Sequence, residues 1–219
     1  MNDKVKKLTG TAMIAVLGLM MTAFFRISLV PMLSFLKYDP KDVIIVLGGF
    51  IWGPLSALAA SLIASLIEMV TFSESGIWGF IMNVLSTCSF AVTAALVYKK
   101  WRTLPGAVAG LVAGVLTMVT AMLLWNYLIT PIYMEYPREA VAKLLIPAFL
   151  PFNAIKGAIN ASLAFLLYKP LITALRKARL VEVGGGVSDS NKKPVALWLA
   201  AAGVLVVCVI SALVMNDII

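Results

Sequence analysis

The chain has 219 residues, of which 62% are hydrophobic and 13% are charged, and its mean hydropathy is +1.00. A soluble domain is about half apolar and about a quarter charged, so this composition excludes a soluble protein. The net charge of +8 therefore bears on membrane topology, and we expect no nucleic-acid partner. The sequence contains no histidine, which removes the commonest metal ligand and the commonest general base. The length suits about five to seven membrane helices and no separate soluble domain.

Apolar runs along the chain predict an all-α integral membrane protein. The first run ends at Val30-Pro31, and the long run from Val43 to Thr71 is broken at Trp52-Gly53-Pro54, where glycine and proline interrupt a helix. A Gly-Gly-Gly segment at 184–186 precedes the last apolar run. The predicted helices cover residues 8–30, 43–52, 55–72, 77–98, 105–129, 145–172 and 195–214.

The distribution of basic residues predicts the orientation in the membrane. If the N-terminus is cytoplasmic and the helices alternate, twelve lysines and arginines fall on the cytoplasmic side and four on the outer side. Cytoplasmic loops carry an excess of positive charge, so we expect a multi-pass protein of the cell membrane with a cytoplasmic N-terminus and an extracellular C-terminus. The two remaining basic residues, Arg26 and Lys156, lie within predicted helices.

Lys156 is the most informative of these charges. Asn153, Lys156 and Asn160 are spaced three and four residues apart, so they share one face of the predicted 145–172 helix. An ammonium group at bilayer depth costs about 2.5 to 3.5 kcal/mol on insertion scales, so it is kept where it faces a polar cavity or a partner. The alternative is that Lys156 snorkels to the outer interface, which is within about two helical turns. The two flanking asparagines favour the cavity.

Further polar residues gather at the predicted outer ends of the helices. Asn126 lies one turn before a proline break, where it forms either a ligand contact or a hydrogen bond between helices. The first outer loop carries Tyr38, Asp39 and Lys41, which we expect to lie over Asn126, Asn153 and Lys156. Two more charged residues have open interpretations. Arg26 either pairs with an outer carboxylate or snorkels, and Glu68, near the outer end of its predicted helix, either is buried or reaches water.

The residue types of this group favour binding over catalysis. Asparagine amides both donate and accept hydrogen bonds, while lysine only donates, so the set suits a neutral ligand rich in carbonyl and imide groups. It contains no nucleophile–base pair, and the chain has no phosphate-binding loop of the ATPase type. The sequence therefore predicts a binding subunit without enzymatic activity and without an energy source of its own.

Four motifs between residues 8 and 172 carry a family resemblance. They are Leu36-Lys-Tyr-Asp-Pro-Lys-Asp42, Gly48-Gly-Phe-Ile-Trp-Gly-Pro54, Trp125-Asn-Tyr with Pro131-x-Tyr133, and Pro151-Phe-Asn-x-x-Lys156. The chain thereby resembles the substrate-binding S-components of energy-coupling factor (ECF) vitamin transporters, and most closely their riboflavin-specific branch. The resemblance implies a six-helix bundle over 1–180, a cytoplasmic linker at 181–194, and an additional C-terminal transmembrane helix at 195–219 that departs from the family pattern.

The resemblance also implies a ligand site and partners. One riboflavin is expected near the extracellular side as the transported ligand, with no resident cofactor and no metal. The expected substrate-binding residues are Asn126, Asn153, Lys156, Leu36, Tyr38, Asp39 and Lys41. The family works with a transmembrane coupling protein and two cytoplasmic ABC-type ATPases, and its members dock through a small-residue motif on the first helix. Thr11-x-x-x-Ala15 is the nearest match to that motif here.

Two alternatives to riboflavin binding stay open at this point. The same fold could take another vitamin or precursor, such as pantothenate, folate or a queuosine precursor. A different class of protein, a membrane-embedded enzyme or a non-transporting membrane assembly subunit, is less favoured. The chain lacks the catalytic pair that an enzyme would need, and an assembly subunit would not need Lys156 within a membrane helix.

Overall fold

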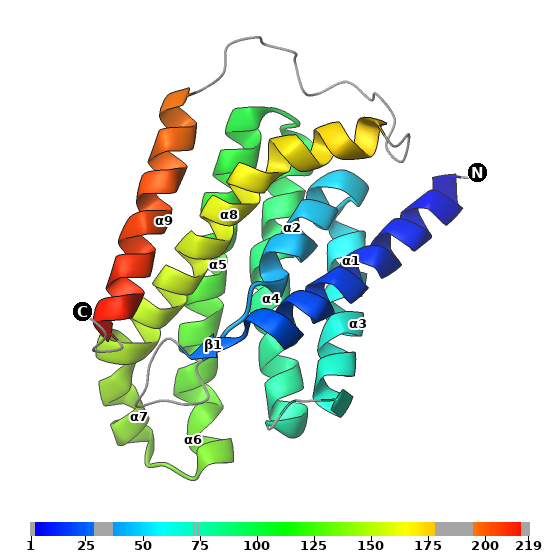
Figure 1. Ribbon diagram of the computed structural model, residues 1–219. Coiled ribbons are helices and arrows are strands. Elements are labelled where there is room, and N and C mark those ends of the chain that lie inside the picture. The colour runs from blue at the N-terminus through cyan, green and yellow to red at the C-terminus, as the bar shows by residue number, and fades with distance from the viewer. Residues whose placement is uncertain (1–2, 29–36, 72, 74, 178–194, 216–219) are drawn as a thin grey trace.

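The structure is a computed structural model that describes residues 3–28, 37–71, 73, 75–177 and 195–215 (Figure 1). These residues are almost entirely helical, with one short antiparallel strand pair. The elements are α1 (Asp3–Phe25), β1 (Ile27–Ser28), β2 (Lys37–Tyr38), α2 (Lys41–Trp52), α3 (Pro54–Thr71), α4 (Gly76–Lys100), α5 (Leu104–Leu128), α6 (Thr130–Met134), α7 (Arg138–Leu144), a π-helical turn (Leu145–Phe149), α8 (Leu150–Lys177) and α9 (Val195–Met215).

Six stretches of the described chain are long and apolar enough to cross a membrane. They are α1, α3, α4, α5, the continuous α7–α8 segment and α9. Helix α2 has 12 residues, so it is about 18 Å long and shorter than an apolar bilayer core of about 30 Å. The predicted all-α membrane fold is confirmed, with α1–α5 and α8 as the bundle and α9 as the additional helix.

The break between α2 and α3 has the cause that the sequence indicated. Gly53 has a φ of +96°, a left-handed conformation that glycine adopts without a steric penalty. Its N–H donates to the carbonyl of Gly49 and ends α2, and Pro54 then begins α3. Proline at the first helical position costs no hydrogen bond, because that N–H has no partner within the helix. The chain therefore reverses direction within a single residue.

Glycines allow a close contact between α4 and α5. A Cβ at Gly110 would lie 2.7 Å from the carbonyl oxygen of Ala94, and one at Gly114 would lie 2.5 Å from that of Phe90. Only glycine leaves room for α4 and α5 to approach at this spacing, as small residues do in membrane proteins generally. The small-residue pattern of the 105–129 segment therefore serves packing within the chain.

The first helix ends earlier than predicted. It ends at Phe25 rather than at residue 30, and Ile27 and Ser28 instead pair with Tyr38 and Lys37. An apolar run does not mark where a helix passes into a strand, so the boundary was wrong.

The Thr11 and Ala15 pair faces inward. Both residues are buried in the chain itself, beside Ile14, which packs tightly against Gly48 of α2. The structure therefore contradicts the expectation that these two residues are presented to a partner subunit.

Helix α9 packs on one side of the bundle, against α8 (Figure 1). The rings of Phe165 and Trp198 lie 6.2 Å apart, and Cys208 and Ala212 are buried. Most of its other large apolar side chains are exposed, as expected of a helix in contact with lipid. The helix agrees with the prediction for 195–214, whereas the proposed linker at 181–194 lies outside the described residues.

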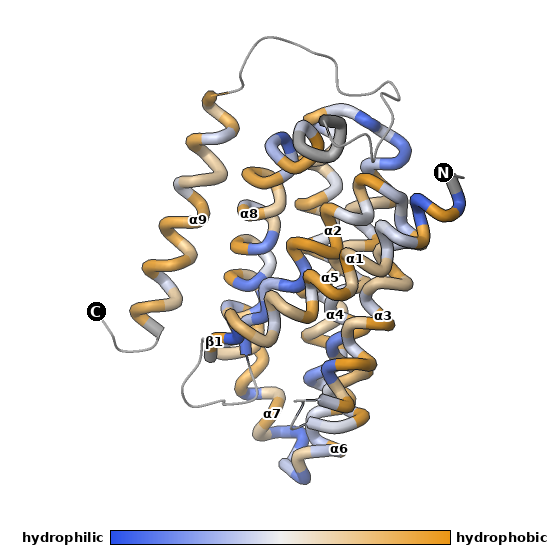
Figure 2. Tube along the Cα trace, turned by 45° about the vertical axis from the view of Figure 1, so that its right-hand side comes forward, coloured by the Kyte–Doolittle hydropathy of each residue, from blue (hydrophilic) through white to orange (hydrophobic). Residues whose placement is uncertain are grey.

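The two ends of the bundle differ in what they carry. Figures 1 and 2 show the start of α1, the end of α8 and the connection between α4 and α5 at one end, and α6 and α7 at the other. The first of these ends carries most of the basic side chains, including Lys7, Lys99, Lys100 and Arg102. We call it the basic end below.

Candidate ligand-binding site

Lys156 lies two turns into α8 and points into the bundle. It is 7% exposed, so it does not snorkel, and that alternative is wrong. Its Nζ lies 3.4 Å from Oδ2 of Asp42 and donates to Oγ of Ser86 at 3.3 Å. A buried ammonium is tolerated when a carboxylate and hydrogen bonds replace its lost water. Asp42 supplies that carboxylate from the first turn of α2.

Asp42 is held by more than this lysine. Its Oδ1 accepts from the hydroxyl of Thr87 at 2.6 Å, and its Oδ2 accepts from the amide of Asn160 at 3.2 Å. The Asn160 amide oxygen in turn accepts from the hydroxyl of Tyr38 at 2.9 Å. Burial, with the Asp42 and Asp39 carboxylates nearby, raises the pKa of Tyr38, so its hydroxyl stays protonated and donates. The network joins β2, α2, α4 and α8.

A second polar network lies between α1, α2 and α3, and Lys41 is its centre. The Nζ of Lys41 lies 2.6 Å from Oδ2 of Asp39 and 2.6 Å from Oε2 of Glu68. The hydroxyl of Thr22 also donates to Asp39 at 2.6 Å. Burial alone would favour the neutral acid, but the ammonium of Lys41, aided by Lys156, lowers the pKa of Asp39 to about 2. Asp39 is therefore a carboxylate.

Arg26 completes this second network. Its guanidinium lies 3.6 Å from Oε1 of Glu68, so it pairs with a carboxylate, as one of its two interpretations proposed. Glu68 is 1% exposed and does not reach water. The two networks together contain three cations and three carboxylates, namely Arg26, Lys41, Lys156, Asp39, Asp42 and Glu68. Because their charges cancel, the interior suits a neutral ligand better than an ion.

A small cavity lies beside Lys156, between α4, α5 and α8. Its volume is about 20 Å³, and its lining residues are Lys37, Met82, Asn83, Ser86, Met122, Phe152, Asn153 and Lys156. This volume accommodates about one water molecule. Sites for ligands of drug or vitamin size have volumes of about 300 to 1,000 Å³. The cavity therefore marks where polar groups of β2, α4 and α8 meet, beside Met122 of α5.

The structure brings some of the predicted site residues to this cavity and not others. Asn153 and Lys156 line it. Asn126 is fully buried but does not line it, because its amide donates to Met122 and accepts from Thr130, one turn away on either side along the chain.

The predicted loop residues occupy different places. Tyr38, Asp39 and Lys41 belong to the two polar networks behind the cavity rather than to its lining. Leu36 lies outside the described residues.

Three polar lining residues were not among the predicted ones. Lys37 was counted only as an outer-loop charge, and Asn83 and Ser86 were not considered. Asn83 and Ser86 are three residues apart on one face of a membrane helix. The same reasoning that identified Asn153 and Lys156 would therefore have found them.

Comparison with known proteins agrees with this architecture. Residues 6–168 match the family described as ECF transporter, substrate-specific component. The chain is 27% identical over 179 residues to the riboflavin transporter RibU of Staphylococcus aureus, covering 78% of this chain and 93% of that protein. It is 29% identical over 190 residues to the riboflavin transporter FmnP of Bacillus subtilis, covering 81% and 99%.

A solved structure extends the comparison to the fold. The S component of a bacterial ECF transporter superposes with a TM-score of 0.66 at 25% identity, and the match covers 80% of this chain and 99% of that one. The family expected from the four motifs is thus confirmed. The chain belongs to the substrate-specific components of ECF transporters, and it is a multi-pass membrane transport protein rather than an enzyme.

Proposed function

We propose that this chain is the riboflavin-binding subunit of an ECF-type vitamin importer. The observation that carries the proposal is the meeting of Lys156, Asn153, Asn83 and Ser86 at one cavity, beside two buried networks whose charges balance. Riboflavin is neutral, and its ring system offers carbonyl and imide groups that such donors and acceptors match. The relatives named as riboflavin transporters support the same ligand.

Lys156 and Asn153 are the proposed direct contacts. Lysine offers three donors, and the bonds of Lys156 to Asp42 and Ser86 are 3.3 Å or longer, so a ligand carbonyl can compete for its ammonium. Tyr38, Asp39, Lys41 and Asn126 remain proposed site residues as well, with the role of holding the walls. A flavin does not fit within about 20 Å³, so binding requires that α4 and α8 separate near Ser86 and Lys156.

The direction of transport follows from the orientation we propose. The basic end faces the cytoplasm, in accordance with the excess of positive charge in cytoplasmic loops. The cavity lies nearer the other end, so the ligand is taken up from outside and delivered inward. Since the chain has no phosphate-binding loop, a transmembrane coupling protein and two cytoplasmic ABC-type ATPases supply the energy in this proposal.

The decisive experiment is the absorption spectrum of the purified protein, followed by a riboflavin titration. We expect a co-purifying flavin band and saturable quenching of riboflavin fluorescence. A thermal-shift panel with riboflavin, pantothenate, folate and a queuosine precursor separates the ligands, because a true ligand stabilises the folded state by mass action. A colourless protein that riboflavin neither stabilises nor saturates would refute riboflavin as the substrate.

A further inference from the structure

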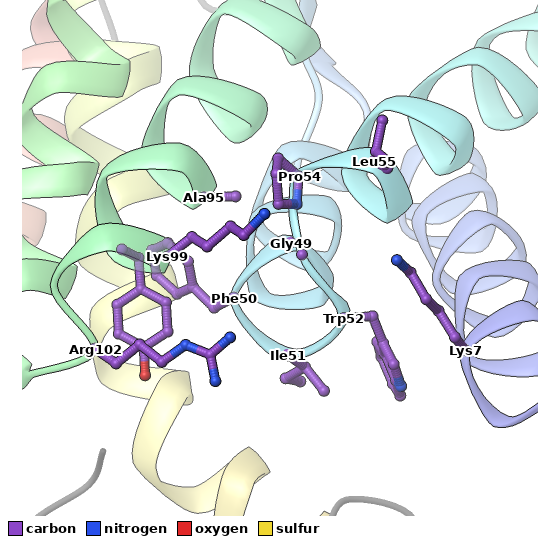
Figure 3. Close-up of a pocket in the computed structure, with 12 residues that line it drawn as sticks. Lys7, Gly49, Phe50, Ile51, Trp52, Pro54, Leu55, Ala95, Lys99 and Arg102 are labelled. Carbon is purple, nitrogen blue, oxygen red and sulfur yellow. The ribbon is translucent and has the colours of Figure 1, made fainter. Parts of the chain in front are cut away.

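A second polar pocket lies at the basic end of the bundle, far from Lys156 along the helices. It has a volume of about 190 Å³, and three cationic side chains line it: Lys7 from α1, Lys99 from the end of α4, and Arg102 from the connection to α5. Figure 3 shows Lys99 and Arg102 on one side of the α2–α3 break and Lys7 on the other. Three separate segments of the chain therefore bring positive charge to one recess.

The base of this pocket is aromatic. Phe50 and Tyr98 line it, and their ring centroids are 4.7 Å apart. Both side chains are buried, so the recess is closed toward the core. Trp52 and Leu55 line its rim at the α2–α3 break. The recess is thus a formed cavity with cationic side chains around an aromatic base.

Among the carboxylates whose side chains the structure describes, none forms an ion pair with these cations. Inside the bundle, Asp39 pairs with Lys41 and Asp42 pairs with Lys156. Glu68 pairs with both Lys41 and Arg26. Glu135 and Glu139 lie at the opposite end, by α6 and α7 (Figure 1). Lys7, Lys99 and Arg102 form no ion pair within the described residues, in contrast to the balanced interior. This excess of positive charge favours the binding of an anion.

The position of the pocket indicates which anion. Its lining residues come from α1, from the α2–α3 break and from the end of α4. The exposed Trp101 directly precedes Arg102 in the chain, and tryptophans are common at membrane interfaces. Leu55 belongs both to the pocket and to an exposed apolar face of α3 that continues through Leu62 and Leu66. An anion with an acyl chain attached could therefore place its charge in the pocket and its chain along α3.

We propose that this pocket binds the headgroup of an anionic phospholipid with a single phosphate, of the phosphatidylglycerol type. The guanidinium of Arg102 matches two phosphate oxygens, and Lys7 and Lys99 act as point charges. Basic pockets between membrane helices on the cytoplasmic side bind the headgroups of anionic lipids. A volume of about 190 Å³ is smaller than that of most whole-ligand sites, which suits a headgroup whose acyl chains remain in the bilayer.

The test compares lipids and matched variants of the full-length chain. Binding of phosphatidylglycerol and of phosphatidylcholine to the detergent-purified protein is measured by native mass spectrometry and by thermal unfolding. The pocket variant is Lys7→Gln/Lys99→Gln/Arg102→Gln. The control variant, Lys6→Gln/Lys100→Gln/Lys169→Gln, removes the same charge from residues that do not line the pocket. Glycerol 3-phosphate serves as the headgroup without acyl chains.

We expect the wild type to prefer phosphatidylglycerol, and the pocket variant to lose about fivefold in affinity for each cation removed. The control variant should keep most of its preference. Equal losses in both variants would mean a general attraction to the basic end and would overturn the proposal. Glycerol 3-phosphate binding as tightly as the lipid would also overturn it, in favour of a soluble phosphate. If the pocket variant unfolds in phosphatidylcholine, the single variants Lys7→Gln and Arg102→Gln provide the same comparison.

Discussion

Two lysines are buried in the part of the chain that the structure describes, and their surroundings differ. The ammonium of Lys41 lies 2.6 Å from each of two carboxylates, those of Asp39 and Glu68. The ammonium of Lys156 has one carboxylate at 3.4 Å, that of Asp42, and a serine hydroxyl at 3.3 Å. Lys156 also lines the cavity, whereas Lys41 does not.

Lys41 is therefore a structural charge, whereas the contacts of Lys156 can be exchanged for contacts with a ligand. Lys41 has short ion pairs with Asp39 in the β2–α2 connection and with Glu68 of α3, and it does not line the cavity, so its role is to hold α2 against α3. The contacts of Lys156 with its partners are longer and weaker. Asp42 keeps its hydrogen bonds with Thr87 and Asn160 when that lysine moves. A polar ligand can therefore take the place of part of its coordination at a modest cost.

The largest effect is expected from Lys41→Met. This variant leaves the carboxylates of Asp39 and Glu68 buried without their ammonium, and loss of one partner of a buried pair costs about 3 to 5 kcal/mol. Thermal or denaturant unfolding in detergent without ligand measures the loss. A variant as stable as the wild type would show that Lys41 is not a structural centre, and the contrast between the two lysines would fail.

A smaller loss of stability but a larger loss of binding is expected from Lys156→Met. If Lys156 donates to riboflavin, its removal weakens binding by about 1 to 3 kcal/mol, or about 5- to 150-fold. Fluorescence quenching of riboflavin measures the affinity. Lys169→Met, an exposed lysine on the same helix, is the matched control and should bind as the wild type does. An unchanged affinity in Lys156→Met would remove this lysine from the site while leaving the proposed substrate intact.

The pairing of Lys156 with Asp42 is open to a double-mutant cycle. Asp42→Asn alone leaves an ammonium buried beside a neutral amide, while Asp42→Asn with Lys156→Met removes both charges. We expect the double variant to be more stable than the sum of the single losses predicts, by about 0.5 to 3 kcal/mol, as for residues in one network. Additive losses in unfolding experiments would show that the 3.4 Å contact carries no coupling.

The helices could be predicted from the sequence because their signals are local. The apolar runs and the Trp52-Gly53-Pro54 break each depend on neighbouring residues, and most helix boundaries agree within a few residues. The exceptions are both ends of α1, the end of α8, and the short helices α6 and α7, which the sequence did not predict. The inward position of Lys156 followed from the asparagines on its face. In both cases the physical cause lies within one or two helical turns.

The partners of the buried charges could not be predicted in this way. Lys41 and Glu68 are 27 residues apart, and Asn160 and Asp42 are 118 apart, so their pairing depends on how helices pack. The sequence placed Asp39 and Lys41 in the first outer loop but did not predict that both are almost fully buried, because Glu68 of α3, far along the chain, supplies the balancing charge. A small-residue pair such as Thr11 and Ala15 likewise does not tell which side of a helix meets its own bundle.

The smallest effects test the part of the site that the sequence analysis missed. Asn83 and Ser86 line the cavity from α4, opposite Asn153 and Lys156 on α8. If both donate or accept a hydrogen bond to the ligand, Asn83→Ala and Ser86→Ala each weaken riboflavin binding by about 0.5 to 1.5 kcal/mol. Thr117→Ala, which removes an exposed hydroxyl of α5 that bonds only to Ala113, should leave affinity unchanged. If Ser86→Ala binds riboflavin as tightly as Thr117→Ala, Ser86 only positions Lys156 in the absence of ligand. Ser86 then makes no polar contact with the ligand.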